Sequence, residues 1–170
     1  MSVWLILEQG KAKNYKFEEY LMLDDIGWML LEELQRNGRA SYRDLGDKVG
    51  LTAPAVADRV RKMERDGIIT GYRAEVDHEK LGVPLRAIIR VKTSAASVGK
   101  VNDLVQNMPE VVECHHVTGS ENHVIRARLR STKHLEQLLY ALTPYGETVT
   151  NIVMSSAVDG GVLTREIARG

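Results

Sequence analysis

Four residues in the second half of the chain, Cys114, His115, His116 and His123, are of the types that bind metals or carry protons. Because alternate residues of a strand point to the same face, Cys114 and His116 share a face and His115 points away. His123 returns on the next predicted strand, so three ligands could meet there, enough for a metal site. We favour a core position for Cys114 and interface or pocket positions for the histidines, and therefore expect no metal.

The turn that joins these two strands could instead hold a small zwitterion. A glycine turn between antiparallel strands leaves backbone N–H groups free for a carboxylate, and Glu121 could pair with an ammonium group. Hairpins of this composition are also common without any ligand, with polar side chains that are only solvated. The alternative pocket lies against the last predicted strand, near Ser155. The candidate ligand-binding residues are Thr118, Gly119, Ser120, Glu121, Asn122, His123 and Ser155.

Basic residues in the first half of the chain indicate a second kind of chemistry. Residues 36 to 73 carry nine lysines and arginines against five acidic residues, a net charge of +4, whereas the formal net charge of the whole chain is zero. Because neutralised phosphates release their counterions, a local basic excess favours binding to nucleic acid. Overall neutrality argues against a general polyanion binder, so any such contact must be local.

Two short helices are predicted to present these charges. Ser41 caps the first and Gly50 ends it in a left-handed conformation, while Thr52 caps the second and Pro54 stands in its first turn. The second helix is apolar on one side and basic on the other, which is typical of a helix-turn-helix with its recognition helix. Similar helix pairs also occur in proteins that never bind DNA. The candidate DNA-binding residues are Arg39, Ser41, Arg43, Thr52, Ala53, Pro54, Ala55, Asp58, Arg59, Arg61, Lys62, Tyr72 and Arg73.

Two charged residues of the second helix have more than one interpretation. Asp58 could accept from a cytosine amino group, or it could orient Arg61 or Lys62 through a helical pair, and we favour the second. Arg59 is expected to reach a phosphate while its stem packs at the edge of the core, which would set register rather than sequence preference. The stripe predicted to be buried on the opposite side is Val56, Val60 and Met63.

Supporting elements surround this helix pair. A helix is predicted over residues 23 to 36, with an apolar side at Ile26, Leu30, Leu31 and Leu34. Residues 68 to 77 are predicted to form a strand in the position of a wing, which places Tyr72 and Arg73 near the DNA. Residues 78 to 82 are interpreted as a hinge before Pro84.

The second half changes its hydrophobic period. Strands are predicted over 85–93, 111–118, 123–129 and 149–158, and helices over 97–108 and 135–142. This β-α-β-β-α-β order is the ferredoxin-like split βαβ arrangement, with an antiparallel sheet and both helices on one face. Cover for the other face is most simply supplied by a second copy of the same sheet. The predicted class is α+β.

The segment LDDIGWMLLEELQRNGRASYRDLGDKVGLTAPAVADRVRKMERDGIITGYRAEVDHEKLG closely resembles the N-terminal half of the Lrp/AsnC, or feast/famine, regulators. The resemblance continues through VVECHHVTGSENHVIRARL and the final strand. It implies a winged helix-turn-helix joined to a ferredoxin-like ligand-binding domain. It also implies dimers that assemble into tetramers or octamers, and an amino acid or similar effector bound where dimers meet.

One departure from the family pattern concerns the ligand. Many members read G-D-x-D in the turn after the third strand, whereas this chain has Gly119-Ser120-Glu121-Asn122. A half-buried ammonium without a charged partner is costly, so either Glu121 takes that role, the effector differs, or the site is vestigial.

Two other functions stay open. Sirohaem decarboxylases resemble the same architecture and use histidines of the second domain, but the aromatic-rich strand associated with them is missing, because VIRARL follows His123. An effector-free DNA-binding assembly protein is the other alternative. We expect a regulator rather than an enzyme, without a cofactor beyond its effector.

Composition and length set the remaining expectations. The single cysteine excludes an intrachain disulfide and suits the cytoplasm, and no apolar run reaches the roughly 20 residues that span a membrane. We expect an N-terminal extension over 1–21, with Met22 as a plausible true start, a DNA-binding domain over 22–83 and an effector-binding, oligomerising domain over 84–170. If the extension is native, it is expected to pack on a partner surface through Trp4, Leu5 and Leu7.

Overall fold

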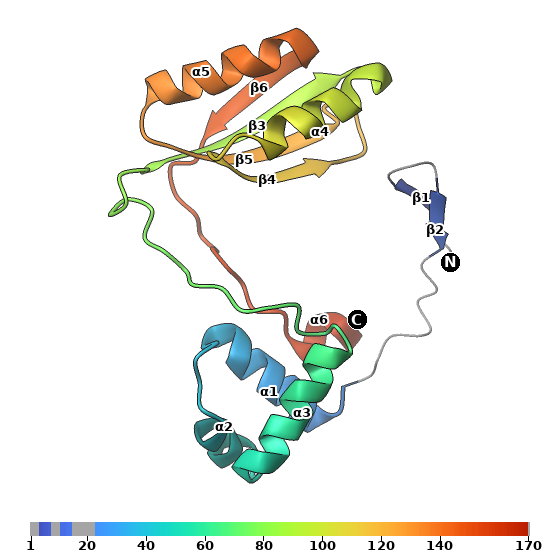
Figure 1. Ribbon diagram of the computed structural model, residues 1–170, viewed down its shortest axis with the longest axis vertical. Helices are drawn as coiled ribbons and strands as arrows, with labels where there is room; N and C mark the ends of the chain where they lie inside the picture. The colour runs from blue at the N-terminus through green and yellow to red at the C-terminus, as the bar shows by residue number, and fades with distance from the viewer. Residues whose placement is uncertain (1–3, 8–10, 15–22, 170) are drawn as a thin grey trace. The chain divides into compact units, whose positions relative to one another are not determined.

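The computed structural model describes residues 4–7, 11–14 and 23–169 of the chain. It divides into two compact units (Figure 1). The first, here the helical unit, contains the described residues up to Arg73 together with 160–169, and the second, the sheet unit, contains 74–159. The C-terminal residues thus belong with the helices, whereas the sequence analysis assigned them to the second domain.

Three helices form the body of the helical unit: α1 (Asp25–Arg36), α2 (Tyr42–Val49) and α3 (Ala53–Arg65). The predicted caps explain where α2 begins and ends, since the Asp44 N–H donates to Ser41 Oγ at 3.1 Å and Gly50 is left-handed with φ 70°. Thr52 occupies the N-cap position of α3, but its side chain makes no capping hydrogen bond.

The apolar sides of these helices meet in one core. α3 contributes the predicted stripe, and α2 contributes Leu45. Glycine at position 46 allows α2 to lie close to the backbone of Leu51, because a Cβ at Gly46 would lie 2.3 Å from the Leu51 carbonyl oxygen. The buried core residues are Leu30, Leu31, Leu34, Leu45, Val56, Val60 and Met63.

The predicted wing strand over residues 68–77 is wrong. Among the described residues, none from 66 to 84 lies in a strand. The N–H groups of Ile68 and Ile69 both donate to the Met63 carbonyl, at 2.9 and 3.1 Å, so the chain first turns back on the end of α3. A strand needs a neighbour to bond with, and local sequence does not supply one.

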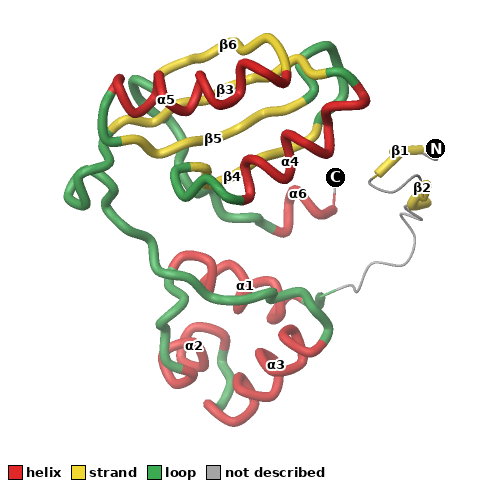
Figure 2. The backbone as a smooth tube through the Cα atoms, turned by 45° about the horizontal axis from the view of Figure 1, so that its top comes forward, coloured by secondary structure: helices red, strands yellow, loops and turns green. Residues whose placement is uncertain are grey.

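The sheet unit has the predicted split βαβ arrangement. Strands β3 (Leu85–Thr93), β4 (Val111–His116), β5 (His123–Leu129) and β6 (Gly146–Ile152) pair antiparallel in the order β4-β5-β3-β6. Helices α4 (Val98–Gln106) and α5 (Thr132–Leu142) cover one face (Figure 2). β6 begins and ends earlier than the predicted 149–158.

Alternation along β3 separates the two faces of the sheet. Ala87, Ile89 and Val91 are buried under the helices, in a core with residues of β5, α4 and α5. The intervening side chains, Arg86, Ile88, Arg90 and Lys92, point to the face that neither helix covers; this is here called the open face.

Three short elements complete the described chain. β1 (Trp4–Leu7) and β2 (Lys11–Asn14) pair antiparallel, and α6 (Arg165–Arg169) lies near the C-terminus. The prediction that Trp4, Leu5 and Leu7 pack on a partner concerns side chains outside the described ones. Within the described part of the chain, no helix has the length and apolar character needed to cross a membrane.

Candidate nucleic-acid interface and effector turn

The exposed side of α3 is polar and mostly basic. Pro54, Asp58, Arg61, Lys62 and Arg65 are all exposed, opposite the buried stripe. This side of the helix is therefore accessible to a large anionic partner. Pro54, Asp58, Arg61 and Lys62 of this side are among the residues predicted to bind DNA, and that role stays a prediction.

One of these residues is held by a neighbour on the same helix. The Arg61 guanidinium lies 2.5 Å from Asp58 Oδ1, in an i, i+3 pair between two exposed side chains. This is the orienting role favoured for Asp58. By contrast, Arg43, Lys62 and Arg65 are exposed and form no ion pair with any described carboxylate.

Arg59 has a different environment from its neighbours on α3. One guanidinium nitrogen contacts both carboxylate oxygens of Asp24, at 2.9 and 2.8 Å. Asp24 also caps α1 by accepting a hydrogen bond from the Gly27 N–H. This bond is the main reason why the pKa of the Asp24 carboxyl lies below its ordinary value, and the hydrogen bond from Arg59 lowers it further. Arg59 thus ties α3 to the start of α1, a role that the sequence analysis missed.

Tyr72 packs back on the helical unit. Its hydroxyl donates to Glu64 Oε1 at 3.1 Å, and burial together with the Glu64 charge raises the pKa of Tyr72 to about 12. It borders a hollow of about 320 Å³ that also includes Arg39 and Ser41. Tyr72 and Arg39 are therefore brought together beside α2, although no wing strand carries them.

In the predicted effector turn, Asn122 has a structural role. Its Oδ1 accepts from the Thr93 N–H at 3.0 Å, and its Nδ2 donates to the Thr93 carbonyl at 2.9 Å. The side chain therefore fastens the turn to the end of β3. Gly119, with φ 114°, supplies a backbone conformation that other residues rarely adopt.

His123 lies inside the sheet unit. Its side chain is fully buried, and Nε2 lies 3.2 Å from Asn102 Oδ1. Burial, with a smaller contribution from His116, lowers the pKa of His123, which favours the neutral ring. The residue is therefore an internal partner of α4 rather than an accessible ligand-binding group.

Glu121 is already paired within the chain. Its carboxylate lies 3.3 Å from the Arg90 guanidinium, which also donates to Asn151 Oδ1 at 3.1 Å. Both side chains are partly exposed. Sequence reasoning missed Arg90; the only signal was the β3 alternation that places this residue on the open face.

Ser155 does not join the turn. β6 starts beside Thr93, near the turn, and ends at Ile152, beside Ala87. Ser155 follows Ile152 and is exposed. It therefore lies beyond β6, at the end of the strands that is opposite to Thr118–His123.

Cys114 and its neighbouring histidines do not form a cluster of metal ligands. Cys114 packs against the sheet core, and burial raises the pKa of its thiol. His115 points the other way and contacts Glu113 at 3.4 Å. Within the described ranges, no group of three or more His, Cys, Asp or Glu side chains is placed to hold a metal ion.

Comparisons with known proteins agree with this arrangement. Residues 23–70 match the family described as winged helix-turn-helix DNA-binding, and 86–163 match the Lrp/AsnC ligand binding domain. The HTH-type transcriptional regulator LrpC of Bacillus subtilis is 33% identical over 79% of this chain and 94% of its own length. The LrpC structure aligns with TM-score 0.76 and 32% identity over 82% of this chain and 99% of that chain.

A second solved structure carries a small molecule. The feast or famine regulatory protein from M. tuberculosis, complexed with L-methionine, aligns with TM-score 0.74 and 30% identity, covering 81% of this chain and 96% of that one. Both halves of the chain and their order therefore match the same group of regulators. The chain belongs to the Lrp/AsnC family of transcriptional regulators.

Proposed function

We propose that this chain regulates transcription by placing α3 against a specific duplex DNA sequence, and that an amino acid or similar metabolite bound to the sheet unit modulates this. The observation that carries the proposal is the exposed basic side of α3. The opposite side of this helix, with Val56, Val60 and Met63, is buried in the core and fixes its position. The relatives' names as HTH-type transcriptional regulators support it, as they support a role other than catalysis.

The contacts within α3 suggest different roles for its cations. Arg61 is held by Asp58, and a guanidinium in a fixed orientation suits a base edge. Lys62 and Arg65 have no such restraint, and suit phosphates. Arg59 contributes by holding α3 in place through Asp24.

Salt dependence tests DNA binding directly. We expect fluorescence anisotropy titrations with a fragment of the protein's own promoter to show affinity that falls steeply as salt rises. An unrelated fragment of equal length is expected to bind more weakly at every salt concentration. Equal binding to both fragments, or no binding to any genomic fragment, contradicts a sequence-specific regulator.

The effector is proposed to bind at the turn Thr118–Glu121, near Arg90. An α-amino acid could place its ammonium at Glu121 and its carboxylate at the Arg90 guanidinium, so that one ion pair is exchanged for two. The L-methionine complex of a relative supports this class of ligand. The buried position of His123 argues against the tetrapyrrole decarboxylase, because that ring is not available to a substrate.

A thermal-shift screen of amino acids, with L-methionine first, tests the effector site. A ligand that binds only the folded chain raises the melting temperature by mass action. We expect Glu121→Ala and Arg90→Ala each to reduce the shift. Glu147→Ala, which removes the partner of Lys92 on the same face, is the control and should leave it unchanged. An equal shift in all variants places the pocket elsewhere.

Assembly is the third part of the proposal. The open face carries Ile88 and Val149 among its charged residues, and Val149 is 43% exposed. A second copy of the sheet could cover this face in an isologous dimer, and dimers could join into tetramers or octamers. Light scattering that gives the 19.0 kDa monomer at micromolar concentration contradicts this assembly.

A further inference from the structure

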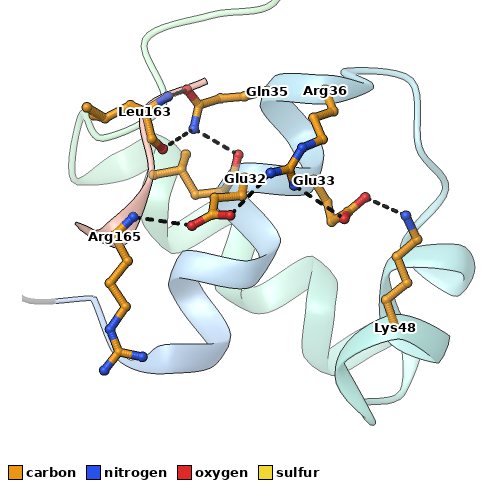
Figure 3. Close-up of polar contacts among 8 residues, drawn as sticks. Glu32, Glu33, Gln35, Arg36, Lys48, Leu163 and Arg165 are labelled. Atoms are coloured by element: carbon orange, nitrogen blue, oxygen red, sulfur yellow. Dashed lines mark hydrogen bonds and ion pairs between the residues drawn. The ribbon is translucent and has the colours of Figure 1, made fainter. Parts of the chain in front are cut away.

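One glutamine side chain of α1 holds the backbone of Leu163 in the C-terminal segment (Figure 3). Gln35 Nε2 donates to the Leu163 carbonyl at 2.9 Å, and the Leu163 N–H donates to Gln35 Oε1 at 2.8 Å. One amide side chain therefore satisfies both backbone groups of a residue 128 positions away. The contact fixes a backbone segment rather than a single side chain.

Arg165, two residues further on, adds two more contacts with α1. Its N–H donates to Glu32 Oε1 at 3.2 Å, and its guanidinium lies 2.7 Å from Asp25 Oδ1. Residues separated by seven and by three positions lie on the same side of a helix with 3.6 residues per turn. Asp25, Glu32 and Gln35 therefore form one stripe, here called the α1 stripe.

The α1 stripe is separate from the parts of α1 that hold the helical unit together. Leu30, Leu31 and Leu34 point into the core. On another side Glu33 pairs with Lys48 (Figure 3). The stripe can therefore lose its partner without disturbing the three-helix core or the exposed side of α3.

We propose that the α1 stripe is a docking surface for residues 160–167 of the same chain, and that this contact, the C-terminal clasp, restrains the helical unit. The chain leaves the helical unit after Arg73 and returns to it at Gly160, so the two units are joined twice along the chain. The contacts of the clasp are individually weak because they are at the surface. Covalent attachment compensates, since a short connection gives an effective concentration in the millimolar range.

Hydrogen exchange of the full chain, followed by mass spectrometry, tests whether the clasp forms. Gln35→Ala removes both bonds to Leu163, and we expect exchange in the peptide covering 160–169 to rise about tenfold. Gln137→Ala makes the same change at an exposed glutamine of α5 and should leave that peptide unchanged. Equal exchange in both variants, or a wild-type segment that exchanges like a free peptide, overturns the proposal.

A second measurement tests the restraint itself. The chain has two tryptophans, so Trp4→Phe leaves Trp28 of α1 as a reporter of the helical unit. Adding Gln35→Ala is expected to increase the fast component of its time-resolved fluorescence anisotropy, whereas adding Gln137→Ala is not. If the anisotropy decay is the same in the Gln35→Ala and Gln137→Ala variants, the C-terminal clasp does not restrain the helical unit.

Discussion

The exposed side of α3 and the turn Thr118–His123 were both predicted to bind partners, but their side chains are in opposite states. On α3, Lys62 and Arg65 form no ion pair with a described carboxylate. In the turn, Asn122, His123 and Glu121 all have partners within the chain. Polar residues of a turn can therefore stabilise the fold, while Lys62 and Arg65, which form no ion pair with a described carboxylate, are available to a ligand.

The largest effect that we expect from the difference between the two regions is the loss of stability caused by Asn122→Ala. It leaves the N–H and the carbonyl of Thr93 without their partners, and should destabilise the sheet unit by about 2 kcal/mol in urea unfolding. Ser120→Ala, at an exposed residue of the same turn, should change stability by less than about 0.5 kcal/mol. Similar values for the two variants would mean that Asn122 is only solvated.

Lys62→Ala should show the reverse behaviour. We expect DNA affinity to fall roughly tenfold and the salt dependence to become shallower, while stability changes by less than about 0.5 kcal/mol. Lys133→Ala removes an exposed lysine of α5 and is the matched control. A loss of stability in Lys62→Ala would remove the contrast between the two regions.

The pH dependence of stability gives a third test of the comparison, at His123. Because its pKa is lowered on folding, the unfolded state binds the proton more readily. The neutral His123 ring therefore contributes fully to the free energy of unfolding when the pH is above the ordinary pKa of 6.5. This contribution is lost as the pH falls below that value. We expect His123→Leu to flatten this pH dependence in denaturant unfolding and the exposed His115→Gln to preserve it.

The smallest effect is expected for Asp24→Asn, which keeps the cap of α1 and removes the charge opposite Arg59. Since the pKa of Asp24 is lowered on folding, its contribution is present above the ordinary value of 3.8 and is lost as pH falls through the lowered value. The pair is partly exposed, so we expect a loss below about 1 kcal/mol at neutral pH. Asp47→Asn on α2 is the control, and an equal loss there would refute a specific role for the pair.

Local signals in the sequence predicted much of the fold. The Ser41 cap, the Gly50 turn and the bounds of β3 follow from residues next to one another in the chain, and all three are confirmed. The wing strand and the end of β6 were wrong because strand pairing depends on distant partners. Gly146 illustrates this: it starts β6, where a Cβ would lie 2.2 Å from the Lys92 carbonyl oxygen, and local sequence does not reveal that close approach.

The candidate sites were less predictable than the fold. Amphipathic spacing was sufficient to find the exposed side of α3, because exposure follows from helix geometry alone. The partners of Arg59 and Glu121 come from other elements of the same unit, and no spacing rule joins Arg59 to Asp24 or Glu121 to Arg90. Such pairs become visible only when the elements are placed in space.

The return of the C-terminal segment to α1 has a consequence for biosynthesis. Domains generally fold as they emerge from the ribosome, N-terminal parts first. The three helices of the helical unit are translated early, but Leu163 and Arg165 are translated only after the whole sheet unit. A nascent chain can therefore expose the basic side of α3 before the clasp can form, and the restrained state is reached only after the residues that follow the sheet unit have been translated.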